Sequence, residues 1–218
     1  GHSGQNEQQE LTRSNVFDIG SVSKHFTAFA IMRLKDKELL NFDDSLSKYL
    51  PELPFKGVTI RHLLTNTSGV PDVMGYFSKL YRSGDVKHPI TNQTVITALI
   101  SEKMKLRFVP GDKWEYSNTG YSLLASVVEQ VSGVSFSDFM QREFFEPMAM
   151  NNTFVYQVNN TQSFESNRAM GFKLQYDGSI KNYDQIPLYY VIGPGGIYSN
   201  SEDLALWVKA MLRKTIVS

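Results

Sequence analysis

Cysteine is missing from all 218 residues of the chain. This absence excludes disulfide bonds, thiolate metal sites and a cysteine nucleophile. Net charge is missing too, because 22 basic residues balance 22 acidic ones. Without a basic field the chain is poorly suited to nucleic acid or to anionic membranes, so we expect neither as a partner. The four histidines form no pair with metal-ligand spacing, and we expect no metal and no cofactor.

Long hydrophobic runs are also absent. No stretch approaches the roughly 20 apolar residues that span a bilayer, so membrane association is not visible in the sequence. No signal peptide is recognisable, and the chain begins with Gly1. What remains is an ordinary globular composition, with 41% hydrophobic and 20% charged residues. The length suits one large domain or two small interleaved ones.

Apolar periodicity predicts a helical middle flanked by mixed segments. The predicted helices cover residues 21–36, 94–105, 121–131 and 135–145, and the predicted loops cover 66–75 and 108–120. Extended segments are predicted at residues 154–156, 171–176 and 188–192. The Gly-Pro-Gly-Gly run at 193–196 indicates a sharp turn. Residues 199–202 fit a capping box before a helix over 203–212.

Ser21 and Lys24 form a Ser-x-x-Lys motif at the start of the first predicted helix. Residues three apart lie on one helix face, so the amine of Lys24 can reach the hydroxyl of Ser21. A neutral amine there can accept the serine proton. The backbone N–H of Ser21, at the positive end of the helix dipole, could supply one oxyanion donor. Taken alone, the motif favours a simpler reading, a serine N-cap followed by a solvated lysine.

A second motif, Tyr116-Ser117-Asn118, lies in the loop over 108–120. The phenol of Tyr116 can relay protons, and the carboxamide of Asn118 can both donate to and accept from an amide-like substrate. The simpler alternative is a turn that precedes a helix. Neither motif decides the function by itself.

Five collinear segments resemble the family of serine β-lactamases and penicillin-binding proteins, of the class C β-lactamase, D-alanyl-D-alanine carboxypeptidase and esterase type. These segments are residues 17–28, 58–72, 110–121, 145–148 and 195–204. The resemblance implies an α/β (α+β) fold of the β-lactamase/transpeptidase type, with an antiparallel sheet flanked by helices and an all-helical subdomain. We expect an incomplete α/β domain over residues 1–50 and 153–218, and a mainly helical subdomain over 51–152.

The resemblance also implies a serine hydrolase that forms an acyl-enzyme at Ser21. Lys24 and Tyr116 would handle protons, and which of them is the main base stays open; Asn118 would bind the substrate. The implied substrates are D-alanyl peptides, β-lactams or esters, as small molecules or peptidoglycan peptides. The implied location is extracytoplasmic, in the periplasm or at the cell surface. The alternative is a catalytically inactive sensor or peptide-binding module, or an inactive fragment.

The sequence departs from the family pattern at three places. The third family motif, Lys-Thr-Gly or His-x-Gly, does not follow the second, and the family usually places a further strand before Gly1. We therefore expect a chain truncated at both ends. The resemblance also implies poor catalysis by these residues alone, because the family's second oxyanion donor comes from the strand just after the third motif. Asn66 stands where a histidine is common.

Overall fold

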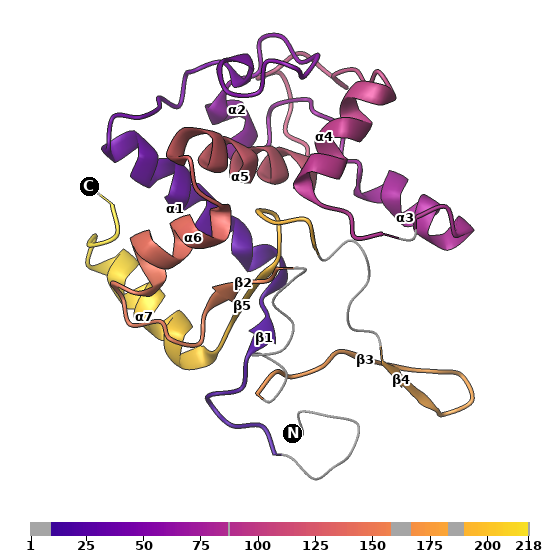
Figure 1. Cartoon of the computed structure of the whole chain (residues 1–218), viewed down its shortest axis with the longest axis vertical. Coiled ribbons are helices and arrows are strands. Elements are labelled where there is room, and N and C mark those ends of the chain that lie inside the picture. The colour runs from indigo at the N-terminus through magenta and orange to yellow at the C-terminus, as the bar shows by residue number, and fades with distance from the viewer. Residues whose placement is uncertain (1–9, 87, 158–166, 183–189, 218) are drawn as a thin grey trace.

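The fold combines a helical body with a small antiparallel sheet (Figure 1). The computed structural model describes residues 10–86, 88–157, 167–182 and 190–217. The elements in chain order are β1 (Phe17–Asp18), the 3-10 turn η1 (Gly20–Val22), α1 (Ser23–Asp36), the 3-10 turn η2 (Leu46–Lys48), α2 (Ile60–Leu64), α3 (Met74–Ser83), α4 (Asn92–Ser101), α5 (Asn118–Ser132), α6 (Phe136–Met140), the π-helical turn η3 (Gln141–Phe145), β2 (Phe154–Val155), β3 (Phe172–Leu174), β4 (Ile180–Asn182), β5 (Ile197–Ser199) and α7 (Ser201–Leu212).

The three-stranded sheet has the order β1-β5-β2, and both pairs of neighbours are antiparallel. Its central strand β5 is buried along its whole length, although it follows the other two strands in the sequence. In the register, Phe17 pairs with Ser199, and Phe154 pairs with Tyr198. A separate hairpin, β3–β4, projects from the body (Figure 1). The pairing of β1 with β5 brings the start of α1 beside the turn that precedes β5.

Helix α5 is the centre of the helical body. All of its residues from Thr119 to Val128 are buried, and it packs against α1, α2, α4 and α6. The hydroxyl of Ser117 caps its first turn by accepting the N–H of Gly120 at 3.1 Å. The helix ends at Gly133, whose φ of 72° is the left-handed conformation that favours glycine. One continuous hydrophobic core includes residues of α1, α4, α5 and β5.

The predicted helices are confirmed with shifted ends. The first begins as predicted near Ser21, but as a 3-10 turn that leads into α1. Helix α4 covers 92–101 rather than 94–105. Helix α5 begins at Asn118, earlier than the predicted 121, because Ser117 caps it. Residues 136–145 are helical, but the winding changes from α to π at Gln141.

The extended segment predicted over 188–192 forms no strand within the described residues. Residues 188 and 189 lie outside the described residues, and residues 190–192 belong to no strand. The N–H of Ile192 donates instead to Oδ1 of Asn92, and the Asn92 side chain donates back to the Ile192 carbonyl, both at 3.0 Å. A side-chain amide on α4 therefore satisfies the backbone groups that a neighbouring strand would have used.

The cap of the last helix also differs from the prediction. Asn200, not Ser199, is the N-cap residue of α7, and its Oδ1 accepts the N–H of Asp203 at 2.8 Å. Ser199 instead remains in β5, where it pairs with Phe17. The sequence did not predict β4, β5 or α3, and β2 and β3 are shorter than the segments predicted there. The division of the chain into two domains stays a prediction.

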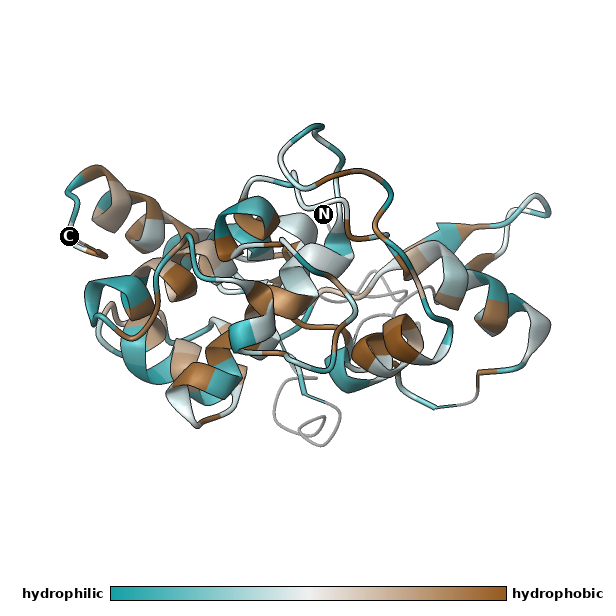
Figure 2. Cartoon of the chain, turned by 90° about the horizontal axis from the view of Figure 1, so that it is seen from above, coloured by the Kyte–Doolittle hydropathy of each residue, from teal (hydrophilic) through white to brown (hydrophobic). Residues whose placement is uncertain are grey.

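Helix α7 combines a buried inner face with an apolar outer one. The indole of Trp207, 2% exposed, stacks on Phe26 of α1 with ring centroids 4.1 Å apart. On the other side, Leu206, Val208 and Leu212 are exposed. Figure 2 shows the hydrophobic segments of this helix near the C-terminus. Within the described ranges, no helix is both long enough and apolar enough to cross a bilayer.

The stacking of α7 on α1 gives a test of the core. We expect Trp207→Ala to lower the free energy of unfolding by about 3–5 kcal/mol, because it removes a large buried side chain. The other tryptophan, Trp114, is 68% exposed, and Trp114→Ala should change the stability by less than about 0.5 kcal/mol. Urea titration followed by circular dichroism measures both. Equal losses in the two variants would contradict the packing described here.

Candidate active site

Ser21 lies at the turn that joins β1 to α1. The turn requires Gly20, whose φ of 51° is in the left-handed region, and its N–H donates to Oδ1 of Asp18 at 2.8 Å. Ser21 is the second residue of η1, which leads directly into α1. It thus lies in the first turn of a helix, where N–H groups have no intrahelical partner. The N-cap positions of η1 and α1 are Ile19 and Val22, so Ser21 is not the N-cap serine of the simpler reading.

Lys24 is buried, with only 8% of its surface exposed, so the alternative of a solvated lysine is wrong. Its Nζ lies 3.2 Å from Ser21 Oγ, 2.9 Å from Oδ1 of Asn118 and 2.9 Å from the carbonyl oxygen of Pro194. These three oxygen atoms come from η1, from the start of α5 and from the turn before β5. The amine therefore joins three parts of the chain that are distant in sequence.

Tyr116 completes the contacts of Ser21. Its hydroxyl lies 2.8 Å from Ser21 Oγ, and its ring centroid lies 4.7 Å from Lys24 Nζ. The side chain is 41% exposed, so it reaches from the buried amine to the surface. A second phenol ring, that of Tyr121, has its centroid 5.6 Å from Lys24 Nζ. Burial raises the pKa of Tyr121, as does the nearby Tyr116, and its hydroxyl donates to the Leu64 carbonyl.

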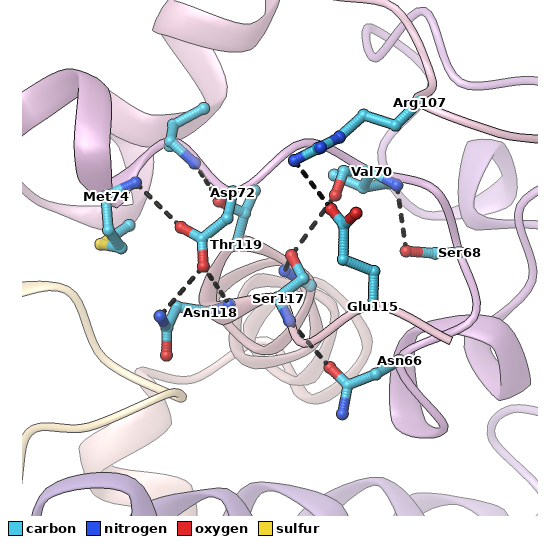
Figure 3. A network of polar contacts seen from close by, with 12 residues as sticks. Asn66, Ser68, Val70, Asp72, Met74, Arg107, Glu115, Ser117, Asn118 and Thr119 are labelled. Atoms are coloured by element: carbon cyan, nitrogen blue, oxygen red, sulfur yellow. Dashed lines mark hydrogen bonds and ion pairs between the residues drawn. The ribbon is translucent and has the colours of Figure 1, made fainter. Parts of the chain in front are cut away.

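The loop over residues 66–72 holds the Tyr116–Asn118 motif (Figure 3). Asn66 accepts the N–H of Glu115 at 2.9 Å on its carbonyl, and the N–H of Ser117 at 3.1 Å on its side chain. Its φ of 56° is left-handed, which asparagine tolerates better than most residues. Asp72 accepts from both the backbone and the side chain of Asn118. No pattern in the sequence marks Asp72 as a site residue, although it lies within the segment 58–72.

The turn at Gly193 and Pro194 approaches α1 and α5 closely. The Gly193 carbonyl accepts the hydroxyl of Thr27 at 2.9 Å, and the Pro194 carbonyl accepts from the Lys24 amine. Gly193 has a φ of 104°, and a Cβ placed there would lie 2.3 Å from the carbonyl oxygen of Tyr121. Only glycine allows this approach. The Pro194 carbonyl was missed from the sequence because a backbone acceptor has no side-chain signature.

Ser21, Lys24, Tyr116 and Asn118, all selected from the sequence, thus lie together in one hydrogen-bonded cluster. The β-lactamase family model matches residues 1–218. The chain belongs to the β-lactamase family. Penicillin-binding protein 4* of Bacillus subtilis (strain 168) is 35% identical over 100% of this chain and 49% of its own length. This member therefore spans about half the length of that curated relative.

Solved structures agree with the family assignment. A penicillin-binding protein from Bacillus halodurans has a TM-score of 0.82 and 30% identity, covering 100% of this chain and 65% of its own. An octameric penicillin-binding protein homologue from Pyrococcus abyssi has a TM-score of 0.84 and 31% identity, covering 100% of this chain and 50% of its own. The β-lactamase/transpeptidase-like fold predicted from the sequence is therefore confirmed.

The close approach of Gly193 to α5 can be tested by substitution in this β-lactamase family member. We expect Gly193→Ala to lower the free energy of unfolding by about 1–3 kcal/mol, because its Cβ would press on the α5 backbone. Gly195→Ala is the matched control, since nothing lies within 4 Å of a Cβ there and φ is outside the left-handed region. Denaturant titration of both variants decides it. A Gly195 variant as unstable as the Gly193 variant would contradict the close approach.

Proposed function

We propose that this β-lactamase family member is a serine hydrolase in which Ser21 forms the acyl-enzyme. One observation carries the proposal: Ser21 Oγ lies within hydrogen-bond distance of two proton-transfer groups at once, the Lys24 amine at 3.2 Å and the Tyr116 hydroxyl at 2.8 Å. A nucleophile and a base within this range are what covalent catalysis needs. The first-turn position of Ser21 adds a backbone N–H for the developing oxyanion.

The proposed acylation step uses Lys24 as the base. A neutral amine has two N–H groups, which match the two fixed acceptors, Asn118 Oδ1 and the Pro194 carbonyl. Its lone pair then faces Ser21 and takes the hydroxyl proton as Oγ bonds to the substrate's carbonyl carbon. The carbonyl π electrons move onto oxygen and return as the bond to the leaving group breaks. Tyr116 gives its proton to the leaving group and regains one from Lys24.

Tyr116 is the alternative base, and this alternative requires a protonated Lys24. A protonated Lys24 would donate to all three of its acceptors, Ser21 Oγ included. The Ser21 proton would then pass to Tyr116 ionised as a phenolate. Deacylation repeats either sequence with water: the base takes a proton from water, the new C–O bond forms, and Ser21 leaves reprotonated.

The proposed substrates are D-alanyl peptides, β-lactams or esters, as small molecules or peptidoglycan peptides. Family membership and the relatives named as penicillin-binding proteins support this choice. An extracytoplasmic location, in the periplasm or at the cell surface, is proposed on the same basis. The second candidate is an inactive sensor or peptide-binding module with the same fold. It has no need for Ser21 to contact two proton-transfer groups, so the arrangement favours the enzyme.

Ser21 should be the residue that a covalent probe modifies. We expect a fluorescent penicillin or a fluorophosphonate to add to its Oγ, because the base beside it makes this hydroxyl the most nucleophilic serine. Peptide mass spectrometry after labelling identifies the modified residue. The Ser21→Ala variant should remain unlabelled. A label on another serine, with Ser21 unmodified, would refute the assignment.

Replacing the two proton-transfer groups separates their roles. We expect Lys24→Ala to slow the labelling of Ser21 by about 10²–10⁴-fold, the usual contribution of a general base. Lys105→Ala, at an exposed lysine, is the control and should leave the rate unchanged. With Lys24 as the base, Tyr116→Phe should slow labelling less than Lys24→Ala does. A Tyr116→Phe rate as low as that of Lys24→Ala would instead assign the base to Tyr116.

A further inference from the structure

Three N–H groups converge on the carboxylate of Asp72 (Figure 3). Oδ2 accepts the backbone N–H of Asn118 at 2.9 Å and its side-chain Nδ2 at 3.0 Å. Oδ1 accepts the backbone N–H of Met74, in the first turn of α3, at 2.9 Å. Asp72 therefore connects α3 to the first residue of α5.

Only an ionised carboxylate can accept on both sides in this way. A carboxamide has one accepting oxygen and one donating NH₂ group. An asparagine at position 72 would therefore present its NH₂ either to the donors of Asn118 or to the N–H of Met74. An NH₂ turned toward Met74 would leave one N–H without its acceptor, and an NH₂ turned toward Asn118 would leave two.

Asp72 also fixes which end of the Asn118 carboxamide faces Lys24. Because the carboxylate only accepts, the end of Asn118 that faces it is the donor Nδ2. The accepting Oδ1 is thereby turned toward the Lys24 amine, 2.9 Å away. A flipped carboxamide would place NH₂ against the N–H groups of Lys24 and displace the amine from Ser21.

We propose that Asp72 is a positioning residue: it holds the Asn118 carboxamide in the one orientation that lets its oxygen bind the Lys24 amine beside Ser21. This inference rests on the proposed function for its effect on catalysis, but not for its effect on Asn118. Asp72 touches neither Ser21 nor Lys24 in its hydrogen bonds, and it acts on both through Asn118. The carboxylate thus couples the start of α3 to the site, beside the hydrogen bond from the Val73 N–H to Thr119 of α5.

Two variants of Asp72 test the inference. Asp72→Asn keeps the shape of the side chain but replaces one accepting oxygen with a donating NH₂ group. Asp72→Ser keeps a side-chain acceptor two residues before Met74 for its N–H. The serine side chain is, however, too short to hold Asn118. Asp177→Asn, at an exposed turn carboxylate of the β3–β4 hairpin, controls for loss of charge. We expect both Asp72 variants to slow fluorophosphonate labelling of Ser21 on the order of 10²-fold, as misplaced catalytic groups do, and Asp177→Asn to leave it unchanged.

The second readout is independent of activity. Nuclear magnetic resonance follows the side-chain amide protons of Asn118, assigned by their loss in Asn118→Asp. In the unmodified chain they should exchange with water more slowly than those of the exposed Asn151. Both Asp72 variants should shift these signals and speed their exchange, which a helix-capping role alone would not do.

The outcomes separate the two hypotheses. Exchange at Asn118 as fast as at Asn151 in the unmodified chain would overturn the positioning role, even if an Asp72 variant fails to fold. Unchanged Asn118 signals, or unchanged labelling, in folded Asp72 variants would overturn it as well. If the unmodified chain is not labelled at Ser21, the proposed hydrolase fails, and the Asn118 signals alone decide the role of Asp72.

Discussion

The buried amine of Lys24 is the constraint on which the rest of the structure depends. A polar group removed from water costs free energy unless it finds partners, and a charged one costs more. Lys24 finds its partners on η1, on α5 and in the turn before β5. These three segments must therefore meet at one point. The central place of β5 in the sheet and the close approach at Gly193 bring the turn before β5 to the other two segments.

Two helix beginnings converge on this amine. Ser21 lies in the first turn that leads into α1, and Asn118 is the first residue of α5. In α5 the N–H groups of Asn118 and Gly120 are already bound, by Asp72 and Ser117. Under the proposed function, the oxyanion donor therefore comes from the turn at Ser21. The almost wholly buried α5 keeps its own end in place. Helix beginnings thus position Ser21, Lys24 and Asn118, while Tyr116 and Pro194 lie in the segments that lead into α5 and β5.

Residues of the cluster come from all three sequence segments of the proposed domains. Ser21 and Lys24 belong to residues 1–50, Tyr116 and Asn118 to 51–152, and Pro194 to 153–218. If the domain division holds, the site lies between the domains, where ligand sites are common. The hydrogen bonds of Asn66 and Asp72 hold the loop over residues 66–72 against the start of α5. Asn66 does this where the family commonly has a histidine.

The sequence alone determined the parts of this protein that depend on neighbours within one or two helical turns. Helical periodicity located α1, α4 and α5, and the spacing of Ser21 and Lys24 predicted their contact across one turn. The family resemblance brought Tyr116 and Asn118 to the same site. Local patterns failed where a distant group satisfies the backbone, as Asn92 does for Ile192 in place of a strand partner.

Tertiary structure alone decided which distant groups complete the site. The Pro194 carbonyl meets Lys24 across 170 positions of sequence, and Asp72 meets Asn118 across 46. No periodic pattern records such pairs, because they arise only when β5 enters the sheet between β1 and β2 and α5 packs against α1. A backbone carbonyl has no residue type to recognise, and an aspartate in a loop resembles any turn residue until its three donors are in place.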